Sequence, residues 1–189
     1  MVKVKGEKCV YMPENNVNWY VLFVKTGSED DIVKQLKYYL GDACLPFLPK
    51  KVCVYRRNGK KSLFQKNCFP GYIFIESNKS SKEFILLTLP VIPRIKNAFR
   101  LLNNGDKTDI AMHDYERVAL SKVLGIDHSI DISRGIKEGD SVRIISGSLD
   151  GNEGMITKIN IGRHEAIIRL SMFGKTVDVS VGIEIIEKI

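Results

Sequence analysis

The stretch Phe69-Pro70-Gly71-Tyr72-Ile73-Phe74-Ile75 decides the fold of this 189-residue chain. Proline fixes its own φ and glycine accepts a positive φ, so the Pro-Gly pair predicts a tight turn. The four bulky residues that follow are typical of a strand buried on both faces of a sheet. A second run of this kind, Trp19-Tyr20-Val21-Leu22-Phe23-Val24, comes earlier in the chain. We expect the two runs to pair at the centre of an N-terminal sheet.

Three helices and one further strand are expected around this sheet. The first helix begins with Ser28 as its N-cap and ends at Gly41, which suits the position after a helix. The second opens at Ser80 or Ser81 and runs through Leu89 to a proline, and the third spans residues 113–124. Ile92 to Ile95 is interpreted as a strand. The order of elements predicts an α+β sandwich, in which helices pack on an antiparallel sheet.

A cationic hairpin is expected between the first helix and the Pro-Gly turn. Lys51 to Tyr55 has the composition of a strand, and Asn58-Gly59 is typical of a type I′ turn. The cations at such a tip cannot be buried, so the hairpin projects either into solvent or onto a polyanion. Its basic residues are Lys50, Lys51, Arg56, Arg57, Lys60, Lys61 and Lys66.

The last third of the chain changes to short strands and glycines. Four strands are predicted, over residues 141–146, 154–159, 166–170 and 176–181, with valines facing inward in the last of them. They make a small β-barrel. Polar residues interrupt the preceding segment at every second position, which predicts a flexible linker. The predicted organisation is a basic arm (1–18), an α+β domain (19–125), a linker (126–135) and a barrel (136–189).

The positive charge is concentrated in the first part of the chain. The whole chain has a net charge of +7, and residues 1–135 hold 22 Lys and Arg against 14 Asp and Glu. Residues 136–189 hold 7 against 8. This distribution favours an anionic partner for the N-terminal part.

Several classes of protein are disfavoured by what the sequence contains. The four cysteines have no C-x-x-C spacing and no neighbouring histidines, so they are interpreted as reduced thiols rather than zinc ligands. No apolar run reaches about 18 residues, and no secretion signal is recognised, so we expect a cytoplasmic protein without a membrane span. The three histidines have no paired nucleophile or carboxylate, and no phosphate-binding glycine loop is present. We therefore expect no enzyme, no cofactor and no metal.

The motifs together resemble the NusG family of bacterial transcription elongation factors. Residues 139–156 resemble the KOW motif, with Gly139-Asp140, Val142-Arg143-Ile144 and three later glycines. Trp19-Tyr20-Val21 and Phe69-Pro70-Gly71-Tyr72 precede it in the order and spacing of the family's NGN domain. The resemblance covers residues 18–189. Within the family, the basic arm and hairpin are most similar to the specialised LoaP paralogues, antiterminators that read a leader RNA hairpin.

The resemblance implies two sets of contacts for the NGN domain. An aromatic pocket would bind the clamp helices of RNA polymerase, although these aromatics are equally interpretable as core: Trp19, Tyr20, Phe69, Pro70 and Tyr72. Basic residues would contact DNA, including the non-template strand, in a salt-dependent manner. Those residues are Lys50, Lys51, Arg56, Arg57, Lys60, Lys61, Arg94, Lys96 and Arg100.

The resemblance further implies that the barrel binds a nascent RNA hairpin. The candidate residues are Lys158, Arg163, His164, Arg169, Phe173 and Lys175. Two alternatives for Phe173 stay open, namely docking of a protein such as ribosomal protein S10 or Rho, and a lid on the barrel's own core. The expected function is a monomeric, RNA-targeted antiterminator. The alternatives are a general NusG elongation factor that couples polymerase to the ribosome or Rho, and a ribosome-associated RNA-binding protein.

Overall fold

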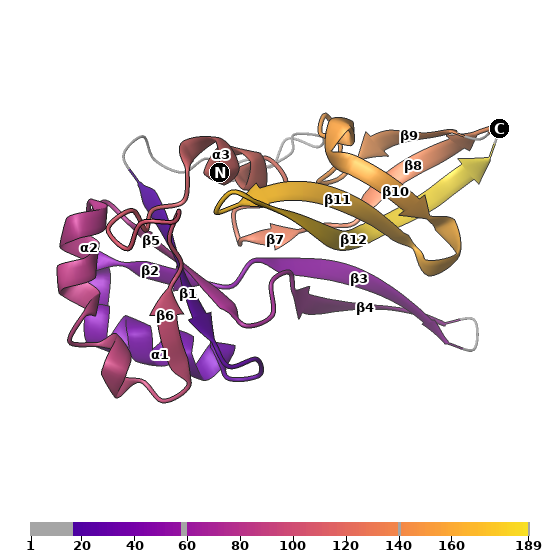
Figure 1. Cartoon of the computed structure of the whole chain (residues 1–189). Helices are drawn as coiled ribbons and strands as arrows, with labels where there is room; N and C mark the ends of the chain where they lie inside the picture. Colours follow the sequence, from indigo (N-terminus) through magenta and orange to yellow (C-terminus); the bar gives the residue numbers. More distant parts are fainter. Residues whose placement is uncertain (1–16, 58–59, 140, 189) are drawn as a thin grey trace, which may run out of the picture.

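The computed structural model describes residues 17–57, 60–139 and 141–188, so the predicted basic arm and hairpin tip lie almost entirely outside the described residues. The fold is α+β, with a helix-covered N-terminal sheet followed by a curled C-terminal β-sheet (Figure 1). The N-terminal sheet has four antiparallel strands in the order β2-β5-β1-β6. These are β1 (Asn18–Val24), β2 (Leu45–Phe47), β5 (Tyr72–Ser77) and β6 (Ala98–Leu101).

The predicted central pairing is confirmed. Strands β1 and β5 run antiparallel, with Val21 opposite Phe74. Gly71 adopts a φ of +84°, and its amide donates to Oε1 of the buried Glu29 at 2.8 Å. A side chain at Gly71 would also lie 3.1 Å from Thr26 Oγ1, so both space and backbone conformation favour glycine at this turn.

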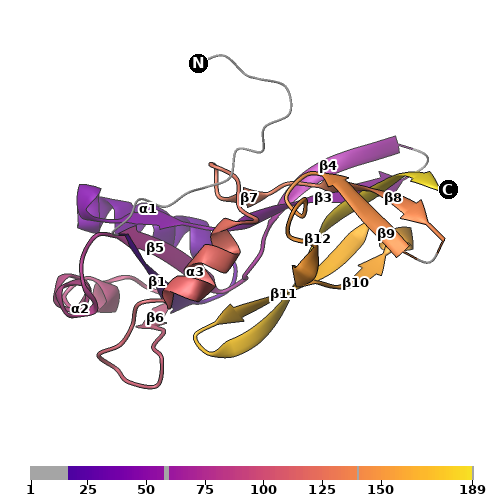
Figure 2. The ribbon, with the colours of Figure 1, turned by 90° about the horizontal axis from the view of Figure 1, so that it is seen from above.

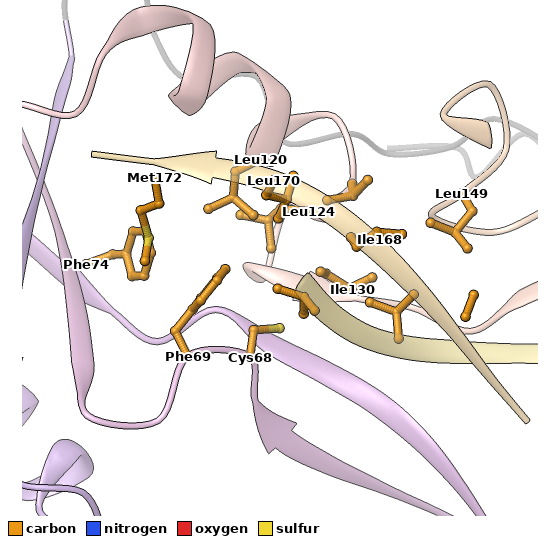
Figure 3. Close-up of a cluster of buried hydrophobic side chains, with 14 of the residues drawn as sticks. Cys68, Phe69, Phe74, Leu120, Leu124, Ile130, Leu149, Ile168, Leu170 and Met172 are labelled. Atoms are coloured by element: carbon orange, nitrogen blue, oxygen red, sulfur yellow. The ribbon is translucent and has the colours of Figure 1, made fainter. Parts of the chain in front are cut away.

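The two faces of the N-terminal sheet are covered by different parts of the chain. Helices α1 (Glu29–Leu40) and α2 (Ser81–Thr88) cover the face that carries Tyr20 and Ile73. Helix α3 (Asp114–Ser121) and the C-terminal sheet cover the face that carries Phe69 and Phe74 (Figure 3). The prediction of strands buried on both faces is therefore confirmed.

The helix ends follow the expected signals only in part. Ser80 forms a full capping box with Glu83 at the start of α2. Ser28 makes no side-chain cap for α1; its hydroxyl instead accepts a hydrogen bond from Asn97 Nδ2 at 3.1 Å. Short 3₁₀ turns also occur: η1 (Gly41–Ala43) follows α1, and η3 (Glu153–Met155) and η4 (Ile161–Arg163) lie in the C-terminal part of the chain.

The strand predicted over Ile92–Ile95 is wrong. This segment is the 3₁₀ turn η2 (Ile92–Arg94), and the strand begins later, at Ala98. The physical reason is Pro93, which has no amide hydrogen for a β-ladder and whose φ suits a helical turn.

The C-terminal sheet has five strands in the order β10-β11-β12-β8-β9. They are β8 (Ser133–Glu138), β9 (Ser141–Ser146), β10 (Ile156–Asn160), β11 (Glu165–Met172) and β12 (Lys175–Lys188). The first half of β12 pairs antiparallel with β11, and its second half pairs parallel with β8. Val179 and Val181 are buried, as the alternation predicts.

The predicted flexible linker at residues 126–135 is wrong. Strand β7 (Ser129–Ile130) pairs parallel with β3 (Lys50–Arg57), which also pairs with β4 (Lys60–Asn67), and β8 begins at Ser133. The polar residues that suggested a linker are satisfied locally. Ser129 Oγ donates to Asp127 Oδ1 at 2.7 Å, and Ser133 Oγ accepts from the Leu149 amide at 2.8 Å. Buried serines with such partners are compatible with regular structure.

Candidate functional site

Trp19 and Tyr20 point to opposite faces of β1, and both are fully buried. The Trp19 ring lies edge-on to Phe47 at 5.2 Å, and its Nε1 donates to Glu76 Oε2 at 3.1 Å. Tyr20 stacks on Phe84 at 3.8 Å, between the sheet and α2. Burial raises the pKa of Tyr20 to about 12. Tyr20 is therefore a core residue of the N-terminal sheet, whereas Trp19 belongs to the face that the C-terminal sheet covers.

Phe69, Tyr72 and Phe74 lie on the same face of the sheet as Trp19, and we call these four residues the aromatic face. The Phe69 and Phe74 rings are 5.3 Å apart, and only 6% of Phe69 is exposed. Tyr72 is half-buried, whereas Pro70 at the turn is exposed. The structure thus brings three of the five predicted polymerase residues to one surface.

The C-terminal part covers this aromatic face. Leu120 and Leu124, together with Leu170 and Met172 of β11, belong to the same buried cluster as Phe69 and Phe74 (Figure 3). Figure 2 shows β11 running toward α3 from the C-terminal sheet. Hydrophobic burial therefore holds the two parts of the chain together.

Polar contacts add to this packing. Glu116 on α3 is only 1% exposed, and its two carboxylate oxygens accept from the amides of Phe173 and Gly174 at 3.0 and 2.9 Å. We call this the Glu116 turn contact. A second polar contact joins β3 to β12, where Lys51 Nζ donates to the Ser180 carbonyl at 2.7 Å. A ligand that needs Phe69 or Phe74 cannot reach them while these contacts hold.

The β3–β4 hairpin places cations directly opposite one another. Its register pairs Lys51 with Lys66, Arg56 with Lys61, and Arg57 with Lys60. Basic residues at facing positions of the register give this hairpin a high density of positive charge, which favours an anionic partner. The hairpin extends from the body of the N-terminal sheet beside β12 (Figure 1).

The other N-terminal cations lie elsewhere. Arg94 lies in η2, Lys96 follows it, and Arg100 faces Phe23 across the β1–β6 pairing. All three are exposed. Because β6 and the strands β3 and β4 extend in different directions, the nine predicted N-terminal cations form two groups rather than one (Figure 1).

The predicted RNA residues of the barrel do not form one cluster. Arg163 and His164 lie at η4, before β11, whereas Phe173 and Lys175 lie at the turn after it. An eight-residue strand spans about 26 Å, which separates these two pairs. Lys158 lies between them on β10. Arg169 binds Asp178 through two hydrogen bonds of 2.9 and 3.2 Å, so its guanidinium is already engaged.

Glu116 is the functional candidate that the sequence interpretation missed. The available signal was its position four residues before Leu120, which places a carboxylate on the buried side of the third helix. Among residues 17–57, 60–139 and 141–188, no three His, Cys, Asp or Glu side chains gather as metal ligands would. Nor does that part of the chain contain a helix long and apolar enough to cross a membrane.

Comparisons with known proteins agree with these features. A family model described as "Transcription termination factor nusG" matches residues 17–120. The chain is 25% identical over 169 residues to the transcription termination/antitermination protein NusG of Thermus thermophilus, covering 85% of this chain and 92% of that protein. It is 26% identical over 182 residues to NusG of Borreliella burgdorferi, covering 90% and 98%.

A solved structure on domain interaction in Thermotoga maritima NusG is 19% identical, with a TM-score of 0.43, and the match covers 88% of this chain and 93% of that one. The family assignment rests on the family model, which spans more than half of the chain. This protein therefore belongs to the NusG family and is a NusG-type transcription termination/antitermination factor.

Proposed function

We propose that this protein is a processive antiterminator that binds RNA polymerase through its aromatic face and is directed to its targets by nascent leader RNA. The observation that carries the targeting step is the β3–β4 register, which brings basic residues to facing positions at three places in a hairpin beside the barrel. Such a density of basic residues favours binding of a polyanion, with release of its counterions.

The aromatic face supplies the polymerase contact. Trp19, Phe69 and Phe74 form an apolar surface that lies within the residues matched by the family model. The family resemblance points to the polymerase clamp helices as its partner. Because the C-terminal part covers this surface, the two parts must separate before polymerase binds.

The leader RNA is bound by the barrel and the hairpin together. On the barrel, Lys158 and Arg163 are exposed, and neither takes part in the Arg169–Asp178 pair. The contact between Lys51 and the Ser180 carbonyl joins the base of the hairpin to β12. The leader RNA is part of the transcript that the polymerase still holds. A factor bound to this RNA is therefore kept at a high local concentration beside its polymerase, so a modest RNA affinity suffices for recruitment.

A general NusG elongation factor is the second candidate. It is favoured by the shared name of the curated relatives and by the engagement of Arg169 with Asp178, which leaves fewer free cations on the barrel. In this case Phe173 would contact a protein such as ribosomal protein S10 or Rho, and leader RNA would have no effect.

Single-round transcription by the cognate polymerase through a terminator distinguishes the two candidates. The template either carries or lacks the leader encoded upstream of the neighbouring genes. We expect readthrough that depends on the leader. Equal readthrough on both templates would refute RNA targeting, and no effect on either template would refute the antiterminator function.

Two variants with matched controls separate the polymerase and RNA steps. Phe69→Ala should weaken polymerase binding and reduce leader-dependent readthrough, whereas Tyr38→Ala, at an exposed position on α1, should do neither. The double variant Arg56→Ala/Lys61→Ala should reduce leader-dependent readthrough but leave polymerase binding unchanged. Its control is Lys34→Ala/Lys37→Ala, which removes the same charge from α1.

A further inference from the structure

A cleft of about 570 Å³ lies where the two parts of the chain meet, beside the Glu116 turn contact. Its N-terminal wall contains Tyr72, Arg100 and the loop 102–105, and its C-terminal wall contains Met172 to Lys175 and Val177. We propose that this cleft binds one nucleotide, with an unpaired base against the aromatic rings and a phosphate on the cations. Its volume lies within the range of small-ligand sites.

Phe173 stands at an unusual backbone position. Phe173 and Gly174 form a two-residue β-hairpin loop, and both have positive φ, at 51° and 70°. Such type I′ loops prefer Asn or Gly at the first position, because a bulky residue there is sterically strained. The Phe173 side chain is partly buried against the core and also lines the cleft. The Glu116 turn contact holds both loop amides and so fixes this conformation.

An aromatic ring also lines the opposite wall. Tyr72 lies 5.5 Å from Phe23, which in turn lies 5.3 Å from the half-exposed Phe99. Tyr72 and Phe173 therefore present rings from both parts of the chain to one cleft. Stacking on aromatic side chains is the main way in which proteins bind unpaired bases.

The charges of the cleft fit an anion. Arg100 and Lys175 line it, and no Asp or Glu is among the described residues of its lining. The nearby Glu116 is buried, and both of its oxygens accept hydrogen bonds from loop amides. A phosphate between a guanidinium and an ammonium group would meet cations from both walls.

The loop of the N-terminal wall is held in place by its own hydrogen bonds. Asn104, which lines the cleft, donates from Nδ2 to the Ala111 carbonyl at 2.8 Å. Rings and cations on such a fixed wall together favour a nucleotide over inorganic phosphate or an apolar molecule.

This inference goes beyond the proposed function, because both parts of the chain build the cleft only while they are packed together. A bound nucleotide would therefore hold the aromatic face closed. The site can be tested without polymerase or leader RNA, so its failure would leave the proposed function untouched.

The test is calorimetric titration of the full chain at low salt with AMP, GMP, CMP and UMP, and with adenosine and inorganic phosphate. We expect at least one mononucleotide to bind about tenfold more tightly than either fragment. Phe173→Asn should weaken this binding by about 5- to 100-fold. Thermal melts check that this variant remains folded, because asparagine suits the loop but loses the contact of Phe173 with the core. Arg100→Ala should also weaken binding, whereas Lys82→Ala, at an exposed position on α2 outside the cleft, should not.

A tetranucleotide RNA distinguishes the source of the nucleotide. Tight binding of the tetranucleotide alone, lost in Phe173→Asn, would assign the site to an RNA strand. Binding of the mononucleotide would assign it to a free nucleotide. The proposal is overturned if neither binds, or if Phe173→Asn and Arg100→Ala bind as well as Lys82→Ala.

Discussion

The Glu116 turn contact gives the sharpest test of how the two parts of the chain are held together. The substitution Glu116→Gln keeps the shape of the side chain but removes its charge. Gln retains one carbonyl oxygen for the amide of Phe173 or Gly174 and presents an amino group to the other. One charge-assisted hydrogen bond is therefore lost and the second is weakened.

The expected magnitude follows from these two bonds. A hydrogen bond to a charged group contributes about 1.5–3 kcal/mol, and a neutral donor left buried without a partner costs about 1–3 kcal/mol. We expect Glu116→Gln to destabilise the packed arrangement by about 2–4 kcal/mol. Since about 1.4 kcal/mol is a factor of ten, the population of the separated arrangement rises by roughly 30- to 1,000-fold.

Amide hydrogen exchange measured by NMR reports the population of the separated arrangement directly, because the Phe173 and Gly174 amides are the donors to Glu116. Their exchange rates should rise by the same factor as the separated population. Asp114→Asn is the control. It removes a carboxylate from the same helix turn, but the Asp114 side chain is 85% exposed. The reasoning is refuted if the two amides exchange less than about threefold faster, or if the control behaves like Glu116→Gln.

Three further predictions concern stability and reactivity. Gly147→Ala should lower the unfolding free energy by about 2–4 kcal/mol, because φ at Gly147 is +95° and a Cβ there would lie 2.5 Å from the Ile132 carbonyl oxygen. Thermal melts measure this loss, and Gly162→Ala is the control, because a Cβ at Gly162 would have no neighbour closer than 3.6 Å. The Ser80 hydroxyl lowers the pKa of Glu83, so the stability that this carboxylate adds to α2 is present at neutral pH and is lost as the pH falls through the depressed pKa. Melts between pH 7 and 3 should therefore show a smaller difference between Ser80→Ala and the original protein at the acid end, where only the bond from the Glu83 amide to the Ser80 hydroxyl still separates them. Burial raises the pKa of Cys68 to about 12, so mass spectrometry after native alkylation at pH 8 should find the half-buried Cys53 modified well before Cys68.

Local patterns in the sequence predict the elements of the fold well. The bulky run after Gly71, the capping signal at Ser80 and the alternation of Val179 and Val181 each act over a few residues. These patterns depend on local sterics and on which residues reach a core. The strand expected at Ile92 fails for a local reason too, because Pro93 within it cannot join a ladder.

The arrangement of the two parts is not predictable in the same way. Periodicity indicates that Phe74 is buried, but not that Met172 of a distant strand covers it. The segment 126–135 is polar because Ser129 and Ser133 carry specific hydrogen bonds, and composition alone cannot distinguish this from exposure to water. The site is limited in the same way. Trp19 and Tyr20 are adjacent in the sequence and lie on opposite faces of β1, and the sequence does not say which face the C-terminal sheet covers.

The pairing of β12 has a consequence for the order in which the chain folds during synthesis. Strand β8 pairs with residues 183–188, so the C-terminal sheet cannot close until those residues have been made. The strands of the N-terminal sheet are complete at Leu101, and α3 ends at Ser121. At typical rates of synthesis, roughly 3–13 s separate these events. During that interval the nascent protein displays an uncovered apolar surface, so the separated arrangement is also the first that each molecule adopts.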